Sequence, residues 1–170
     1  IGGVILERQG NTEEYGFYMV GNQFSLYVGL ATAALFSTFN PDIYESASNG
    51  NRRKLLKILA ILFLVEVLLV FLFELFAPYI IDILTAGRYL SSVPYARVLV
   101  ISNILVMVFY YMNDITIALG YSKIMMWTKL FAGIIAIIVL STLIGKYQYF
   151  GAAWGQSLIY VIYILVNLIF

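Results

Sequence analysis

The sequence predicts an all-α fold, a multi-pass transmembrane helix bundle. Of its residues, 62% are hydrophobic and 11% are charged, whereas soluble domains carry about 25% charged residues. The mean hydropathy is +0.92. Five stretches are long and apolar enough to cross a bilayer, which takes about 20 residues. Helices are expected because lipid offers no partner to an unpaired backbone group, and these stretches lack the alternation of barrel strands.

Proline-containing or polar segments separate the five predicted spans. Pro41 follows the first span, Pro78 follows the second and Pro94 precedes the third, so no proline is expected within a helix. Residues 42–51 are rich in Ser, Asn and Gly and are predicted to form a solvated loop. Residues 79–90 are too few to cross a bilayer and are predicted to form a helix lying in the interface. The predicted spans are 16–39, 55–77, 96–119, 124–144 and 151–170.

Both ends of the sequence are apolar. Residues 1–6 are interpreted as the end of an earlier span, and the last predicted span reaches Phe170. Residues 1–170 are therefore expected to form a single transmembrane domain that is part of a longer protein.

The Lys and Arg residues predict how the bundle is oriented. Six are expected on one side of the membrane and four on the other, with the densest group at 52–57. Cytoplasmic loops carry an excess of basic residues, which places the 52–57 segment in the cytoplasm. The two groups are Arg52, Arg53, Lys54, Lys57, Lys123 and Lys129 against Arg8, Arg88, Arg97 and Lys146.

Composition argues against several classes of function. The sequence has no histidine and no cysteine, the residues that most often serve as general bases, thiol nucleophiles and metal ligands. No catalytic residue, metal site or cofactor is therefore predicted. The net charge of +1 gives no basic field for nucleic acid. An intramembrane aspartyl protease needs two carboxyl groups at one site, and Asp114 is the one Asp within a predicted span.

Glu66 is the most informative polar residue because it lies in the middle of the second span, in LLKILAILFLVEVLLVFLFE. A carboxylate at the bilayer centre costs about 2.5–3.5 kcal/mol on insertion scales. Glu66 is therefore expected to face the protein interior. Two roles stay open: an ion-coupling or ligand-binding site, and a protonated or paired structural carboxyl group.

Other polar residues within the spans could line a cavity. Asn103, Tyr110 and Asp114 are seven and eleven residues apart, which puts them on one narrow face of a helix. On the first span, Asn22 and Gln23 are further candidates. Ser25 and Thr32 are expected to form hydrogen bonds between helices instead. Arg97 begins the third span, where it could pair with phosphate oxygens or extend to the interface.

Three stretches of the chain follow one another in a familiar order. Residues 16–45, GFYMVGNQFSLYVGLATAALFSTFNPDIYE, match G-x-Y-x-x-A…F-x-P-x-I, with Gly21 in place of the Ala. In residues 73–99, FELFAPYIIDILTAGRYLSSVPYARVL, an apolar helix leads into a loop and a new helix. Residues 145–166, GKYQYFGAAWGQSLIYVIYILV, match y-G-x-x-G-A-A, with Gln148 in place of the first Gly. Together they resemble the polysaccharide (O-antigen, lipid-linked oligosaccharide) flippases of the multidrug/oligosaccharidyl-lipid/polysaccharide exporter superfamily.

The resemblance implies a protein of two six-helix lobes in the cytoplasmic (inner) membrane. The five spans would be helices 8–12, in the C-terminal lobe. The lobes would rock about a central polar cavity, through which the head group of a polyprenyl-diphosphate-linked oligosaccharide crosses while its tail stays in lipid. Glu66 and the stripe of Asn103, Tyr110 and Asp114 are then candidates for the cavity wall, and Arg97 is a candidate contact for the diphosphate.

The partners implied are the lipid-linked oligosaccharide, membrane lipids and a coupling ion, either proton or sodium. A multidrug exporter of the same superfamily, a membrane sugar polymerase and a non-transporting assembly subunit remain alternatives.

Overall fold

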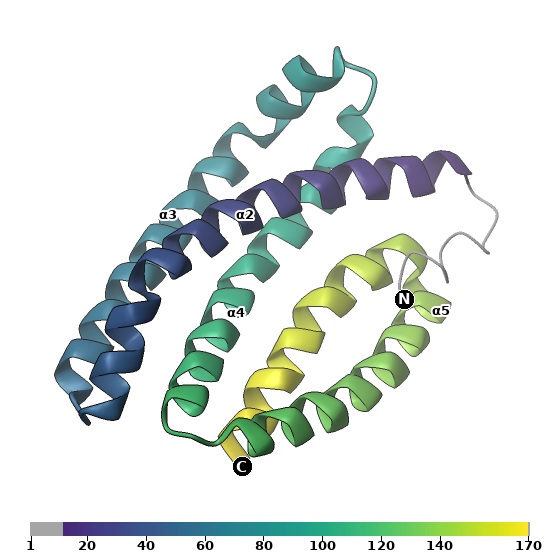
Figure 1. Ribbon diagram of the computed structural model, residues 1–170. Coiled ribbons are helices and arrows are strands. Elements are labelled where there is room, and N and C mark those ends of the chain that lie inside the picture. The colour runs from purple at the N-terminus through teal and green to yellow at the C-terminus, as the bar shows by residue number, and fades with distance from the viewer. Residues whose placement is uncertain (1–11, 170) are drawn as a thin grey trace.

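A computed structural model describes residues 12–169 (Figure 1), and this part of the chain is helical without any strand. The all-α prediction is therefore confirmed. The predictions for residues 1–6, Arg8 and Phe170 concern positions outside the described residues. The elements are α2 (Thr12–Ser48), α3 (Arg52–Thr85), the short 3-10 helix η1 (Leu90–Ser92), α4 (Val93–Ala118) and α5 (Ser122–Ile169).

Four described helices, rather than the five predicted, are long and apolar enough to cross a membrane. The difference arises in α5, which includes the last two predicted spans. Its backbone leaves the helical conformation at Gln148, with φ 50° and ψ −125°, and Figure 1 shows the ribbon doubling back to form two limbs. We refer to residues 122–147 and 149–169 as the first and second limbs of α5.

The prediction that prolines end the first two spans is wrong. Pro41 lies inside α2 and Pro78 lies inside α3, whereas Pro94 is at the start of α4 as expected. A proline within a helix cannot donate to the carbonyl four residues earlier. In α3 that carbonyl belongs to Glu74, and Arg97 Nη2 of α4 donates to it at 3.2 Å.

Because α3 continues past Pro78 to Thr85, the predicted interfacial helix at 79–90 does not exist as a separate element. Its first half is the last part of α3. The helix ends where Ala86 adopts a left-handed conformation, with φ 50°. The rest of the segment forms the turn that leads through η1 into α4.

The predicted loop at 42–51 is also mostly helical, because α2 extends to Ser48. Lys54 of α3 contacts Asp42 at 2.7 Å and Glu45 at 3.3 Å. These ion pairs join the end of α2 to the start of α3. The Asn51 side chain accepts a hydrogen bond from the Lys54 backbone N–H at 3.1 Å and so caps α3. The polar residues of this segment therefore lie at the end of a helix rather than in a long loop.

The pair α2 and α4 forms the centre of the bundle. Each of three buried apolar clusters contains side chains from both helices. Two clusters add residues of α3, and the third adds residues of α5. Accordingly, α3 and α5 lie on opposite sides of the α2–α4 pair, as Figure 1 shows.

Glycine allows two close approaches of backbone in this core. A Cβ atom at Gly21 would lie 2.8 Å from the Ala96 backbone nitrogen, so α2 and α4 meet there at a distance that a side chain would prevent. A Cβ atom at Gly151 would overlap the backbone carbonyl of Leu143, on the other limb of α5. Gly151 and Gly155 form a G-x-x-x-G pattern, which favours close packing of helices, and both face the first limb.

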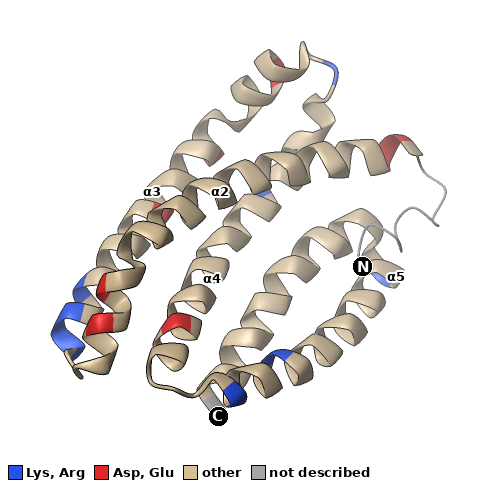
Figure 2. Ribbon diagram, in the orientation of Figure 1, with Lys and Arg blue, Asp and Glu red and all other residues tan. Residues whose placement is uncertain are grey.

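Charged residues are concentrated at the ends of the bundle. Figure 2 shows basic residues at the α2–α3 connection and at the start of α5, which lie at the same end. These positions include Arg52, Arg53, Lys57 and Lys123. The sequence predicted that the basic residues at 52–57 and Lys123 lie on the same side, and the structure places both groups at the same end of the bundle.

Candidate functional site

A groove with polar and aromatic walls runs between α2, α4 and α5. Its volume is about 580 Å³. We call it the polar groove. Its hydrogen-bonding residues are Gln23, Ser25, Tyr27, Ser37 and Asn40 of α2, Asn103, Tyr110 and Asp114 of α4, and Gln156 and Tyr160 of α5. The stripe of three residues on α4 that the sequence singled out thus lies together along one wall.

Asp114 is half-buried and lies four residues before the end of α4. With its amide oriented to donate, Asn40 gives hydrogen bonds to Asp114 Oδ2 at 2.9 Å and to the Phe36 carbonyl at 3.1 Å. Asn113 Nδ2 donates to Asp114 Oδ1 at 3.3 Å. Within residues 12–169, no Lys or Arg forms an ion pair with this carboxylate. Neutral amides hold Asp114 in place.

Asn103 lines the groove and also joins two helices. Its Nδ2 donates to the Ser25 carbonyl at 3.1 Å, and the Ser25 hydroxyl donates to the Leu99 carbonyl at 3.0 Å. Asn103 is 5% exposed. Its amide is therefore mainly occupied in holding α4 against α2, and Ser25 has the interhelical role expected of it.

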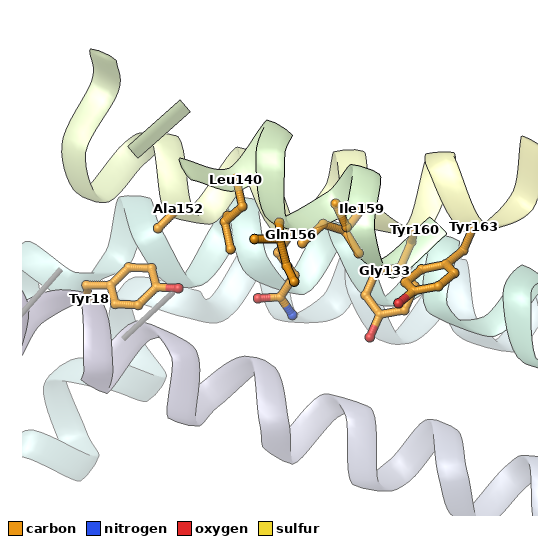
Figure 3. Close-up of a pocket in the computed structure, with 10 residues that line it drawn as sticks. Tyr18, Gly133, Leu140, Ala152, Gln156, Ile159, Tyr160 and Tyr163 are labelled. Carbon is orange, nitrogen blue, oxygen red and sulfur yellow. The ribbon is translucent and has the colours of Figure 1, made fainter. Parts of the chain in front are cut away.

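A second cavity lies next to the polar groove. It has a volume of about 400 Å³ and lies between α2 and the two limbs of α5. We call it the tyrosine pocket. Figure 3 shows Gln156 between Tyr18 on one side and Tyr160 and Tyr163 on the other. The remaining wall is apolar or small, and consists of Gly133, Ala136, Ile137, Leu140, Ala152 and Ile159. Gln156 and Tyr160 line both cavities, so the two form one continuous lining.

The sequence reasoning missed the contribution of α5. Gln156, Tyr160 and Tyr163 are four and seven residues apart, the spacing of a single helix face. A polar residue in an otherwise apolar last span was a usable signal. It was overlooked because the neighbouring G-x-x-x-G pattern explained that region by packing alone.

Glu66 faces the protein interior as predicted, with an exposed fraction of 1%. The Thr32 hydroxyl contacts its Oε2 at 2.7 Å, which gives Thr32 its expected role between helices. Glu66 does not line either cavity. The expectation that Glu66 and the α4 stripe line one cavity is therefore not met in either of these two cavities.

Of the remaining candidate residues, one lines a cavity and two do not. Arg97 lies outside both cavities and pairs with Glu74, with 3.4 Å between Nε and Oε2. Gln23 is exposed and lines the polar groove, whereas its neighbour Asn22 is half-buried and does not. The structure thus brings together Gln23, Asn103, Tyr110 and Asp114 and leaves Glu66, Arg97 and Asn22 apart.

The chemistry of these cavities is that of binding. In the part of the chain that the structure describes, no three His, Cys, Asp or Glu side chains are grouped so that they could hold a metal ion. The linings offer amides, hydroxyls, aromatic faces and one carboxylate. A ligand with a hydrogen-bonding part and an apolar part would fit such a surface.

Comparison with known proteins adds no assignment. Family models, curated proteins and solved structures were all searched, and none matches this chain.

Proposed function

We propose that this chain is part of the C-terminal lobe of a transporter that flips polyprenyl-diphosphate-linked oligosaccharide repeat units across the cytoplasmic membrane, for surface polysaccharide synthesis. The observation that carries the proposal is the continuous lining of the polar groove and the tyrosine pocket among helices of membrane-spanning length. The resemblance of three ordered stretches to flippases supports the same reading.

The two cavities suit an amphipathic substrate. Sugar hydroxyls donate and accept hydrogen bonds, and the groove presents the amides of Gln23 and Gln156 and the hydroxyls of Ser37 and Tyr110. Tyrosine combines an apolar ring with a polar tip, so Tyr160 can contact both the face of a sugar ring and a hydroxyl. In alternating access, a second lobe would cover this lining and the head group would pass between the two lobes.

The proposed topology has five crossings, with each limb of α5 crossing once. At about 1.5 Å per residue, either limb is long enough for a hydrocarbon core of about 30 Å. The basic residues at 52–57 would then be cytoplasmic. The sequence has no cysteine, so Asn51→Cys introduces a unique thiol into it. We expect this thiol to resist impermeant thiol reagents in intact cells and to react after permeabilisation. Ready labelling of intact cells would reverse the orientation.

Transport of an unchanged substrate is proposed rather than catalysis, because no described residue that lines either cavity is a nucleophile with an adjacent base. A sugar polymerase or an assembly subunit is therefore a weaker alternative. A multidrug exporter is the second candidate, and one observation favours it. The single carboxylate of the polar groove, Asp114, could bind a cationic drug.

A flipping assay in proteoliposomes tests the proposal. The full-length protein should move a fluorescent polyprenyl-diphosphate sugar between leaflets and leave it chemically intact. Gln156→Leu should slow flipping about fivefold to tenfold, the kinetic equivalent of losing a hydrogen bond worth about 1–1.4 kcal/mol. Asn22→Leu is the matched control, because Asn22 is a span amide outside the cavities. Cleaved or extended sugars, or equal effects of both substitutions, would contradict the proposal.

A further inference from the structure

The charged lining of the two cavities is of one sign, negative. Among the residues that the structure describes, Asp114 is the one Asp or Glu that lines either of them, and no Lys or Arg does. Of the described basic residues within the helices, Arg97 pairs with Glu74, and Lys129 lies beside the Phe109 ring. A ligand in these cavities therefore meets neutral amides, hydroxyls and aromatic rings, and a single negative group.

Asp114 retains the capacity to bind a further donor. A carboxylate has about four acceptor positions, and the structure fills two of them, with Asn40 at Oδ2 and Asn113 at Oδ1. Both partners are neutral, so they position the carboxylate without cancelling its charge. Because Asp114 is half-buried at the groove wall, a donor in the groove can reach it.

The nearest counter-charge belongs to Lys129 of α5. Its amine acts electrostatically on Asp114, but it forms no ion pair with it and lies 5.8 Å from the centre of the Phe109 ring. Lys129 does not line either cavity. The other titratable groups near the carboxylate are the phenols of Tyr44 and Tyr110. The groove side of Asp114 thus has no built-in cation.

Aromatic rings beside the carboxylate add to the attraction for a cation. Tyr110 is one helical turn before Asp114, and its ring centre lies 6.3 Å from that of Phe36. Both rings line the groove. The negative face of an aromatic ring attracts ammonium groups, more strongly where water is excluded.

We infer that the two cavities bind an amphipathic molecule whose head group carries an ammonium, which pairs with Asp114, while the less polar part lies in the tyrosine pocket. Acidic head groups are disfavoured, and a diphosphate has to lie outside these cavities. The inference deepens the proposed function and rests on it. Two sources share this chemistry: a sugar lipid with a free amino sugar, and a cationic amphipathic drug.

Binding of matched probes to the full-length protein in lipid nanodiscs tests the inference, with empty nanodiscs subtracted. The probes are dodecyl β-glucosaminide, dodecyl β-glucoside and dodecyl β-glucuronide, which differ in head-group charge, and dodecylammonium, which has the same primary ammonium but no sugar. We expect the glucosaminide to bind about tenfold more tightly than the glucoside, as for one charge-assisted hydrogen bond, and the glucuronide to bind most weakly.

Asp114→Asn should reduce the glucosaminide preference to about unity and leave glucoside binding intact, which also verifies folding. Asp82→Asn, at an exposed site outside the cavities, should change nothing. Lys129→Gln should increase the preference, because it removes the opposing charge. A preference that persists in Asp114→Asn would overturn the inference and leave the proposed function standing.

The fourth probe distinguishes the two possible ligands, an amino-sugar lipid and a cationic drug. Dodecylammonium bound as tightly as the glucosaminide would support the ammonium site and assign it to cationic drugs. Much weaker binding would assign it to amino sugars. If none of the three glycosides binds, the proposed function itself fails.

Discussion

Replacing Glu66 by Gln tests whether a negative charge is needed between α2 and α3. The carboxyl group is 1% exposed, and Thr32 is its one hydrogen-bond partner among the described residues. An ionised carboxylate this deep needs several hydrogen bonds or a cation to offset its lost hydration. The structure supplies one hydroxyl, which argues for a neutral, protonated side chain.

The Thr32 hydroxyl leads to the same conclusion. It has a single hydrogen, yet its Oγ1 lies 2.7 Å from Glu66 Oε2 and 3.1 Å from the Val28 carbonyl. Both contacts can be full hydrogen bonds only if the Glu66 carboxyl carries a proton and donates it to Thr32. The Thr32 hydroxyl is then free to donate to Val28.

A glutamine can make the same pair of contacts, because its amide N–H replaces the carboxylic O–H. Glu66→Gln should therefore change the free energy of unfolding by no more than about 1 kcal/mol, in either direction. Thr32→Val leaves the buried carboxyl without its partner and should cost about 1–3 kcal/mol. Because Glu66 lies outside both cavities, flipping by Glu66→Gln should remain at the wild-type rate.

The measurements are thermal unfolding in detergent, monitored by tryptophan fluorescence, and flipping in proteoliposomes. Combining the two substitutions should cost about as much as Thr32→Val alone, because either a neutral carboxyl group or an amide then loses the same partner. Destabilisation of Glu66→Gln by more than about 3 kcal/mol would refute the neutral carboxyl. Lost flipping at normal stability would instead show that Glu66 couples transport to an ion.

Three further substitutions test the packing of the bundle. Gln148→Gly should stabilise the protein by about 1 kcal/mol in thermal unfolding, because glycine adopts φ 50° without strain; a loss of stability would show that the Gln side chain contributes more than its backbone costs. Gly21→Ala should cost about 1–3 kcal/mol, because the new methyl group would meet the Ala96 nitrogen at 2.8 Å; a neutral result would contradict the close approach of α2 and α4. Arg97→Lys should speed amide hydrogen exchange in the second half of α3, because a single ammonium cannot contact both the carboxylate and the carbonyl of Glu74; unchanged exchange would mean that the guanidinium does not support the helix.

Apolar length was sufficient to predict the helices but not where they end. Pro78 was expected to stop a helix, because proline removes a backbone hydrogen bond. Arg97, nineteen residues later, supplies the missing donor. The extension of α2 through residues 42–48 has a similar origin, since Lys54 pairs with Asp42 and Glu45 across the connection. Contacts between separate helices decided both boundaries, and local sequence patterns do not contain them.

The sequence predicted the part of the candidate site that comes from α4 but not the part that comes from α5. Helical periodicity placed Asn103, Tyr110 and Asp114 on one face, because all three belong to one helix. Periodicity does not say which other helix lies opposite, so the contribution of Gln156 was missed and Glu66 was expected beside the α4 stripe, although it lines neither cavity. Depth within an apolar span correctly predicted that Glu66 is buried, but depth is the same on every face of a bundle.

The reversal at Gln148 also bears on how the protein is made. The two limbs of α5 are joined by one non-helical residue, and Gly151 brings the second limb against the backbone of Leu143. In the proposed topology, no length of chain is available for the first limb to enter the bilayer and wait for the second. The hairpin would have to leave the translocon as one preformed unit, carrying its small tip across the membrane. Biogenesis of this region would then depend on the speed of turn formation during synthesis, which the apolarity of either limb alone does not determine.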